Sequence, residues 1–283
     1  MRHAAAVAIA VALAACGQDR AASPAAAPPA APAPKQTIRV AVIGGMIETG
    51  FWAEVAGRFE RSTGHTVELV ASGPKPKVLE AFRKGGVDLV TTHACDAIVN
   101  VVADGLGADP QPWARNDLII VGPAADPAGI RGQRDAIAAV RAIIDTKQKL
   151  LVHASMGADE VLHDLLEAGR LTLPAASTVV MADERGDLLA QAAAASAYTL
   201  VGRIPFASKK LPSAGLELMV QGDLRLRRPY LVVVAAGPDD PRRRAARELA
   251  AYLRSPATQT FIDGFGRGRW DPEPVFYPVV LPP

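Results

Sequence analysis

Glycine, hydroxyl and imidazole groups follow three short runs of β-branched residues in the N-terminal half of the chain. The runs are TIRVAVI (37–43), TVELVA (66–71) and VDLVT (87–91), and each is typical of a buried strand. Ligands of open α/β sheets bind outside the carboxyl ends of the parallel strands. Glycines there let backbone N–H groups approach a ligand, and helix N-termini favour anions. The candidate ligand-binding residues at these ends are Gly44, Gly45, Met46, Ser72, Gly73, Thr92 and His93.

A second group of candidates comes from later in the chain. The loop HASMG (153–157) precedes a predicted helix and offers His153, Ser155 and Met156 as an opposing wall. Arg203 follows another predicted strand and would add a positive charge. A purely structural role is the alternative for these groups: a turn for the paired glycines, a core position for either histidine, and core packing, which we favour, for the two methionines.

Periodicity predicts alternating strands and helices along the chain. Further strands are expected over 118–121, 150–152, 178–181, 198–201, 216–220 and 230–235, and helices over 51–63, 78–84, 134–145, 159–168, 188–195 and 243–253. The βαβαβ order predicts an α/β fold with a largely parallel sheet and helices packed on it. The length of the chain favours two such lobes over one very long sheet.

The N-terminus has the pattern of an export signal. Arg2 and His3 precede an apolar run, 4–13, that is too short to span a bilayer, and small residues lead to Cys16. This end resembles a bacterial lipobox, so residues 1–15 are predicted to be a signal peptide and Cys16 the lipidated residue of a protein anchored at the membrane and facing the periplasm. The alternative is an ordinary secretory signal with a chance cysteine. The alanine- and proline-rich stretch that follows, in 16–35, is predicted to be an extended tether.

Composition excludes several classes of function. The formal net charge is only +2, which gives no reason to expect nucleic-acid binding. With Cys16 assigned to lipid, Cys95 is left alone, so we expect no intrachain disulfide and no cysteine-based zinc site. No Gly-x-Ser-x-Gly or His-Glu-x-x-His pattern occurs. We therefore expect a binding protein without a cofactor or resident metal, and not an enzyme.

Several segments, in this order and spacing, together resemble the tungstate-binding proteins of ABC importers, which are type II periplasmic binding proteins. The segments are NDLIIVGP (116–123), DPAGI (126–130), YTLVGR (198–203), Gly222-Asp223, RPY (228–230) and the closing-helix residues 255–266. The resemblance covers about residues 38–278. It implies two lobes joined by crossover segments, with a ligand in the cleft between them. Lobe 1 would comprise 36–122 and a return segment, 229–283, and lobe 2 would comprise 123–228.

The resemblance also implies a role in transport: a monomer that delivers a small ligand, such as a tungstate or molybdate oxyanion, to a membrane permease. A ligand-sensing lipoprotein that signals to a membrane partner is the alternative. Hinges are expected near Gly122-Pro123 and in the segment before Pro229.

The binding loops depart from those of the family that this chain resembles. Its members carry threonines and serines after the first strand, where this chain has GGMIETG (44–50), and a Ser-Arg-Gly-Asp-like segment where it has His153-Ala154-Ser155. Loss of that arginine and the presence of Glu48 weaken the case for an oxyanion. Our hypothesis is therefore that tungstate and molybdate bind weakly or not at all and that a larger, partly apolar or organic-acid ligand is preferred. Met46, Phe51, Trp52 and Met156 would line the mouth of the site.

Overall fold

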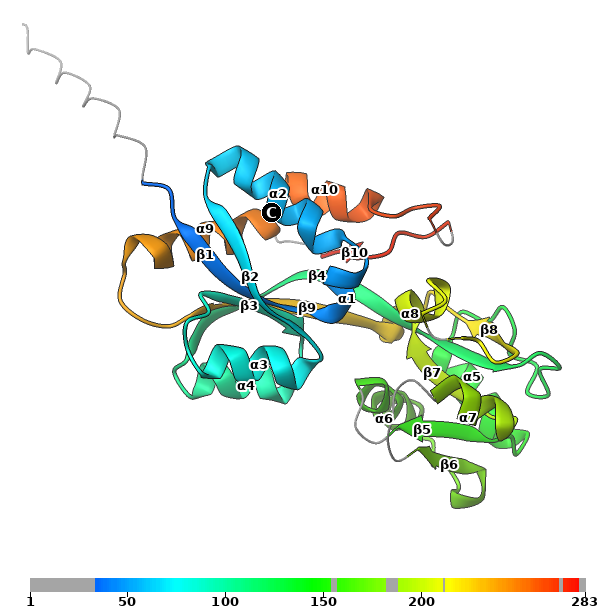
Figure 1. The fold of residues 1–283 in the computed structure, drawn as a ribbon. Coiled ribbons are helices and arrows are strands. Elements are labelled where there is room, and N and C mark those ends of the chain that lie inside the picture. Colours follow the sequence, from blue (N-terminus) through cyan, green and yellow to red (C-terminus); the bar gives the residue numbers. More distant parts are fainter. Residues whose placement is uncertain (1–33, 154–156, 182–187, 211, 270–271, 280–283) are drawn as a thin grey trace, which may run out of the picture. The chain divides into compact units, whose positions relative to one another are not determined.

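The computed structural model describes residues 34–153, 157–181, 188–210, 212–269 and 272–279, and all of these but Pro34 belong to the compact unit Lys35–Pro283 (Figure 1). Strands and helices alternate along the first part of this unit: β1 (Thr37–Ile43), α1 (Gly44–Glu48), α2 (Phe51–Thr63), β2 (Thr66–Gly73), α3 (Lys75–Arg83), β3 (Leu89–His93), α4 (Asp96–Ala103) and β4 (Gly107–Pro123).

The middle part contains α5 (Ala136–Asp145), β5 (Leu150–His153), α6 (Gly157–Gly169), η1 (Ala175–Ser177), β6 (Thr178–Met181), α7 (Leu188–Ala194), β7 (Tyr198–Gly202), α8 (Arg203–Ala207) and β8 (Leu216–Val220). The last part contains η3 (Leu224–Leu226), β9 (Arg227–Ala235), α9 (Pro241–Leu253), α10 (Pro256–Gly264) and β10 (Tyr277–Pro278). The predicted α/β alternation is confirmed.

The strands pair in the order β2-β1-β3-β9-β4-β7-β5-β6, with β8 and β10 also paired to β4. The outer strands are parallel: β1 with β2 and β3, and β5 with β6 and β7. The central strands are antiparallel, because β4 and β9 run beside each other in opposite directions. The expectation of a largely parallel sheet is therefore wrong at the centre, where two crossover strands replace the βαβ connection.

Strand β4 takes part in both halves of the sheet. Its residues 107–117 pair with β9, and residues 118–123 pair with β7 and β8, so the strand changes partners between Asp117 and Leu118. Gly122 and Pro123, where we expected a hinge, lie inside the paired strand. Gly122 is also a site of close packing, because a Cβ there would collide with the ring of Tyr198.

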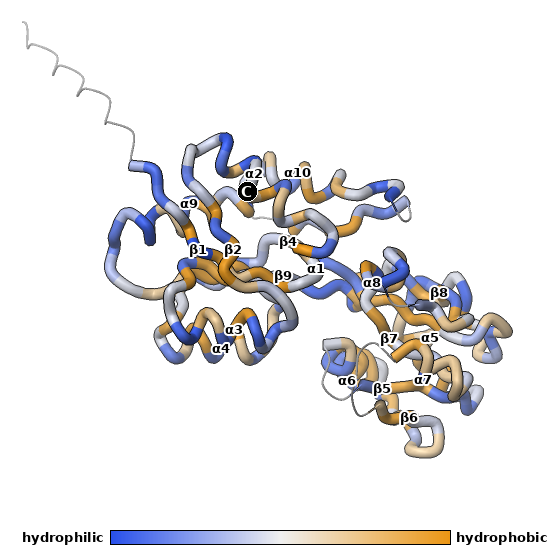
Figure 2. Tube along the Cα trace, in the orientation of Figure 1, coloured by the Kyte–Doolittle hydropathy of each residue, from blue (hydrophilic) through white to orange (hydrophobic). Residues whose placement is uncertain are grey.

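Separate hydrophobic clusters flank the two halves, and Figure 2 shows hydrophobic residues along β9 and β7. In the first half, α2 and α9 contribute to one cluster, and α3 and α4 to another. Phe51 and Trp52 are buried, and the ring of Phe51 stacks on that of Phe276 with the centroids 4.3 Å apart. The expectation that these two residues line the mouth of the site is wrong, because they lie on the core face of α2.

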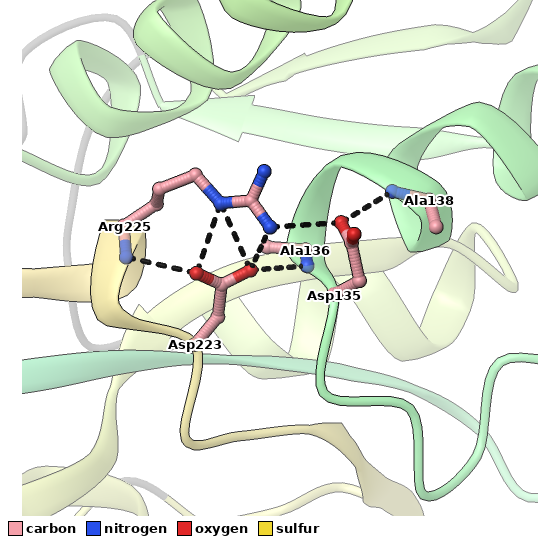
Figure 3. A network of polar contacts seen from close by, with 5 residues as sticks. All are labelled: Asp135, Ala136, Ala138, Asp223 and Arg225. Atoms are coloured by element: carbon pink, nitrogen blue, oxygen red, sulfur yellow. Dashed lines mark hydrogen bonds and ion pairs between the residues drawn. The ribbon is translucent and has the colours of Figure 1, made fainter.

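A carboxylate network fixes the turn that leads into β9 (Figure 3). Asp223 accepts hydrogen bonds from the backbone N–H of Ala136 at 2.6 Å, and from the backbone and side chain of Arg225. Asp135 caps α5 through the Ala138 N–H and accepts from the same Arg225 guanidinium at 2.9 Å. Burial raises the pKa of Asp223, but the hydrogen bonds outweigh it, and the pKa lies below its ordinary value.

Asp223→Asn is therefore expected to destabilise the protein by about 1.5–3 kcal/mol at neutral pH, because an amide cannot replace every accepted bond. A lowered folded-state pKa gives stability that is present above the ordinary pKa of 3.8 and is lost as pH falls through the folded-state value. The difference in free energy of unfolding between variant and wild type should therefore become smaller at acidic pH. Denaturant unfolding of both proteins from neutral to acidic pH would measure it, and a pH-independent difference would contradict the prediction.

Candidate functional site

The candidates at the ends of β1 and β2 lie together. Ile43 pairs with Gly73 across the two strands, and a Cβ on Gly44 would lie 3.5 Å from the Gly73 carbonyl oxygen. Gly44 and Gly45 are the first two residues of α1, which follows β1 directly. Met46 is fully buried and belongs to a hydrophobic core cluster. It is thus a core-packing residue, as we favoured from the sequence, and not a ligand-binding one. Backbone groups therefore dominate this corner of the site.

Two polar residues end β3. The imidazole of His93 stacks on Tyr230 with the ring centroids 4.1 Å apart, and its Nε2 lies 3.0 Å from Asn116 Oδ1. Thr92 is fully buried, and its hydroxyl has no hydrogen-bond partner among the described residues. Thr92 pairs with Leu231 and His93 with Tyr230, so the two side chains point to opposite faces of the sheet, and only His93 shares the face of Tyr230.

Three residues that sequence reasoning did not select join this group: Asn116, Arg228 and Tyr230. Asn116 pairs with Arg228 across β4 and β9, and His93 pairs with Tyr230 across β3 and β9. Directly opposed residues of antiparallel strands share a face of the sheet. These residues occur in the family-like segments NDLIIVGP and RPY, so the signal was present in the sequence. Their common face depends on the strand register, which the sequence does not show.

Charged side chains from α3 and β9 surround Gly157, the first residue of α6. A Cβ on Gly157 would lie 2.8 Å from Arg228 Nη1, 3.6 Å from Glu160 Oε2 and 4.0 Å from Lys75 Nζ, so two cations and one carboxylate lie close to the start of a thirteen-residue helix. Glu160 forms an ion pair with Lys75 at 3.5 Å. His153 is buried at the end of β5, whereas Ser155 and Met156 lie outside the described residues.

Arg203 occupies a different place from the one expected. Only 3% of it is exposed, and its Nε donates to Asp117 Oδ1 at 2.8 Å. A further donor of its guanidinium bonds the carbonyl of Pro274, and Tyr277 donates to Asp117 Oδ2 at 3.1 Å. Burial raises the pKa of Asp117, and Arg203 offsets part of that effect. The charge of Arg203 is thus balanced inside the fold.

Two further features favour an anion over other ligands. Glu48, expected to repel an anion, forms an ion pair with Lys210. The helices α3 and α4, which follow β2 and β3, begin without a side-chain cap, whereas α5, α9 and α10 are capped by Asp135, Asp240 and Ser255. Uncapped helix starts leave N–H groups that can bind an anion.

Among the described residues, no group of three or more His, Cys, Asp or Glu side chains could hold a metal ion. None of the described helices combines the length and apolar character of a membrane span. Two surface hollows are lined by other residues than the candidates from the sequence. One is lined by residues of α2 and α10, and the other by Pro112, Arg115, Leu224, Arg227, Pro229 and Val279.

The sequence model of the family described as bacterial extracellular solute-binding protein matches residues 38–267. The chain belongs to this family. The solute-binding family accounts for the clustering of polar groups at strand ends, and it confirms that the chain is an exported binding protein and not an enzyme.

Relatives of this solute-binding protein include proteins named for anion or tungstate binding. A Haloferax volcanii protein, provisionally named an ABC transporter anion-binding protein, is 28% identical over 251 residues, covering 81% of this chain and 69% of its own length. The tungstate-binding protein TupA of Peptoclostridium acidaminophilum is 27% identical over 255 residues, 86% of each chain. The structure of the tungstate-binding protein of Desulfovibrio alaskensis aligns with a TM-score of 0.73 at 24% identity, covering 87% of this chain and all of the other. The predicted fold of two-lobed periplasmic binding proteins is confirmed.

Proposed function

We propose that this protein captures a small oxyanion, of the kind represented by tungstate and molybdate, for an ABC-type importer. The observation that carries this proposal is the Arg228 guanidinium at the start of α6, next to Lys75, whose charge is shared with Glu160. A helix N-terminus with two cations suits a small anion, because backbone N–H groups and side-chain charges act on it together. The tungstate- and anion-binding relatives support the same class of ligand.

A larger, partly apolar ligand is now the weaker hypothesis. It depended on apolar bulk at the mouth of the site, but Met46, Phe51 and Trp52 are buried in the core. It also depended on the loss of a family arginine from the second lobe's loop. Arg228, from the crossover strand β9, supplies a guanidinium close to the same helix start. The proposed anion would thus meet a planar, permanently charged group although the loop itself has none.

Titration calorimetry with sodium tungstate and sodium molybdate tests the ligand class. Arg228→Gln is expected to weaken binding about 10- to 100-fold, because a hydrogen bond to a charged group contributes about 1.5–3 kcal/mol. Arg134→Gln is the matched control, since Arg134 is exposed at the start of the second half and the charge change is identical. A heat of binding with an organic acid, but with neither tungstate nor molybdate, would favour the hypothesis of an organic-acid ligand. Equal oxyanion affinity of Arg228→Gln and Arg134→Gln would show that Arg228 does not contribute to binding.

We further propose that the protein is lipid-anchored through Cys16 and works with a membrane permease. Cys16 lies outside the described residues, and the support is the order of basic, apolar and small residues before it. A sensing role with the same ligand site is the alternative partner assignment. Co-purification with a permease of the same operon would favour transport, and co-purification with a membrane kinase or cyclase would favour sensing.

A further inference from the structure

The two crossover strands carry different groups on their two faces. Residue 116 pairs with 228, and residue 117 with 227, in a stretch of β4 and β9 without a register shift. Because successive side chains of a strand point to opposite faces, Asn116 and Arg228 share the face of the proposed anion site. Asp117 and Arg227 share the reverse face. The reverse face therefore lies directly behind the site, one residue away on each strand.

A polar cluster covers the reverse face, and we call Asp117, Arg203, Arg227 and Tyr277 the crossover lock. Three of its members are buried, and Arg227 is half-buried. The Arg203–Asp117 ion pair has side-chain exposures of only 4% and 2%. Tyr277 donates to the same carboxylate, and the Arg227 guanidinium lies 4.0 Å from the centre of the Tyr277 ring. The lock joins four segments of the chain: β4, the start of α8, β9 and β10.

We propose that the crossover lock is a positioning device, which holds β4 and β9 in the register and twist that present Asn116 and Arg228 to the anion. Its members do not touch the ligand, because they lie on the opposite face. Among the residues of the crossover lock, Tyr277 allows the smallest change, because substitution by phenylalanine removes only a hydroxyl. Loss of its hydroxyl leaves Asp117 with one donor fewer and frees the strand pair to shift, while the ring can still pack under Arg227.

Tyr277→Phe tests the proposal, and Tyr198→Phe is a matched control. Both tyrosines are buried, and each donates its hydroxyl to an aspartate: Tyr277 to Asp117 at 3.1 Å and Tyr198 to Asp126 at 2.9 Å. Tyr198 also accepts a hydrogen bond from the Ala128 N–H, so its substitution removes more bonds. Tyr198 begins β7 and packs within the second half of the fold. A purely structural role of the hydroxyls predicts that Tyr198→Phe does at least as much harm.

Two measurements on the folded full-length proteins decide the matter. The first is calorimetric tungstate affinity, which should fall about 2- to 30-fold in Tyr277→Phe and stay at the wild-type value in Tyr198→Phe. The second needs no ligand: the nuclear magnetic resonances of the His93 ring and the Asn116 side-chain amide should move in Tyr277→Phe only. Unchanged resonances in that variant, or an equal affinity loss in both variants, would overturn the positioning role.

The affinity measurement depends on the proposed function, because it requires the protein to bind tungstate. The resonance measurement does not depend on it. If the wild type binds neither tungstate nor molybdate, the proposed ligand is wrong, and the resonances alone still decide whether the lock positions the crossover. If the wild type binds tungstate and Tyr277→Phe binds it equally well with shifted resonances, the lock affects the strands without governing the site, and the positioning proposal fails.

Discussion

Replacing Arg203 by methionine is expected to lower the free energy of unfolding by about 3–5 kcal/mol, because it leaves the carboxylate of Asp117 buried without its ion-pair partner. Both side chains of the pair are almost fully buried. The methionine fills a similar length of space, so the loss reflects charge more than volume. Denaturant unfolding followed by circular dichroism measures the change. Arg134→Met, at an exposed position, is the control and should change stability by less than about 0.5 kcal/mol.

The pH dependence of this variant separates charge from packing. Burial raises the folded-state pKa of Asp117 above 3.8, and loss of Arg203 should raise it further. A raised carboxyl pKa favours the folded state in acid, and that advantage is lost as pH rises through the folded-state value. The destabilisation by Arg203→Met should therefore be larger at neutral pH than in acid. A constant deficit across this range would show that packing, and not the buried charge, accounts for the effect.

Cys16→Ser is expected to abolish stable membrane attachment, because the thiol that would carry the lipid is removed. Several acyl chains on one residue give far stronger membrane binding than one chain, so the change should be close to all-or-none. Partition of wild type and variant between detergent and aqueous phases measures it, with Cys95→Ser as the matched control. Equal partitioning of processed wild type and Cys16→Ser would exclude the lipoprotein assignment and leave an ordinary secretory signal.

The strands of this fold were predictable where short, mainly apolar runs end at glycine or polar residues. TIRVAVI and LELMV are observed as β1 and β8 with the expected bounds. The prediction for β4 covered only residues 118–121, because the preceding stretch contains Pro110 and Pro112. The structure accommodates these prolines with register shifts in the pairing of β4 with β9 between Ala108 and Gln111 and between Pro112 and Ala114. Local pattern could not show that a polar, proline-containing segment pairs at the centre of the sheet.

Side-chain roles at the site were harder to predict, because they depend on partners that are distant in sequence. Arg203 follows a strand, as a ligand-binding arginine would, but Asp117 lies 86 residues earlier and neutralises it. Phe51 and Trp52 follow the candidate segment 44–50 in sequence. They lie on the buried face of α2, however, and so do not line the candidate site. Arg228 was recognised only as part of a family-like segment, since its approach to Gly157 requires both lobes. Strand ends are local features, whereas the direction of a side chain depends on the tertiary fold.

The connectivity of β4 and β9 has a consequence for folding kinetics. The first half of the sheet is completed by β9 and β10, which the chain supplies only after all the strands of the second half. The pairing that joins β3 to β4 must therefore wait for a segment more than a hundred residues away in sequence from either strand. Such non-local pairing requires loop closure before any contact is gained, and it slows folding. The second half, whose parallel strands β5, β6 and β7 are close in sequence, should acquire protected amides first.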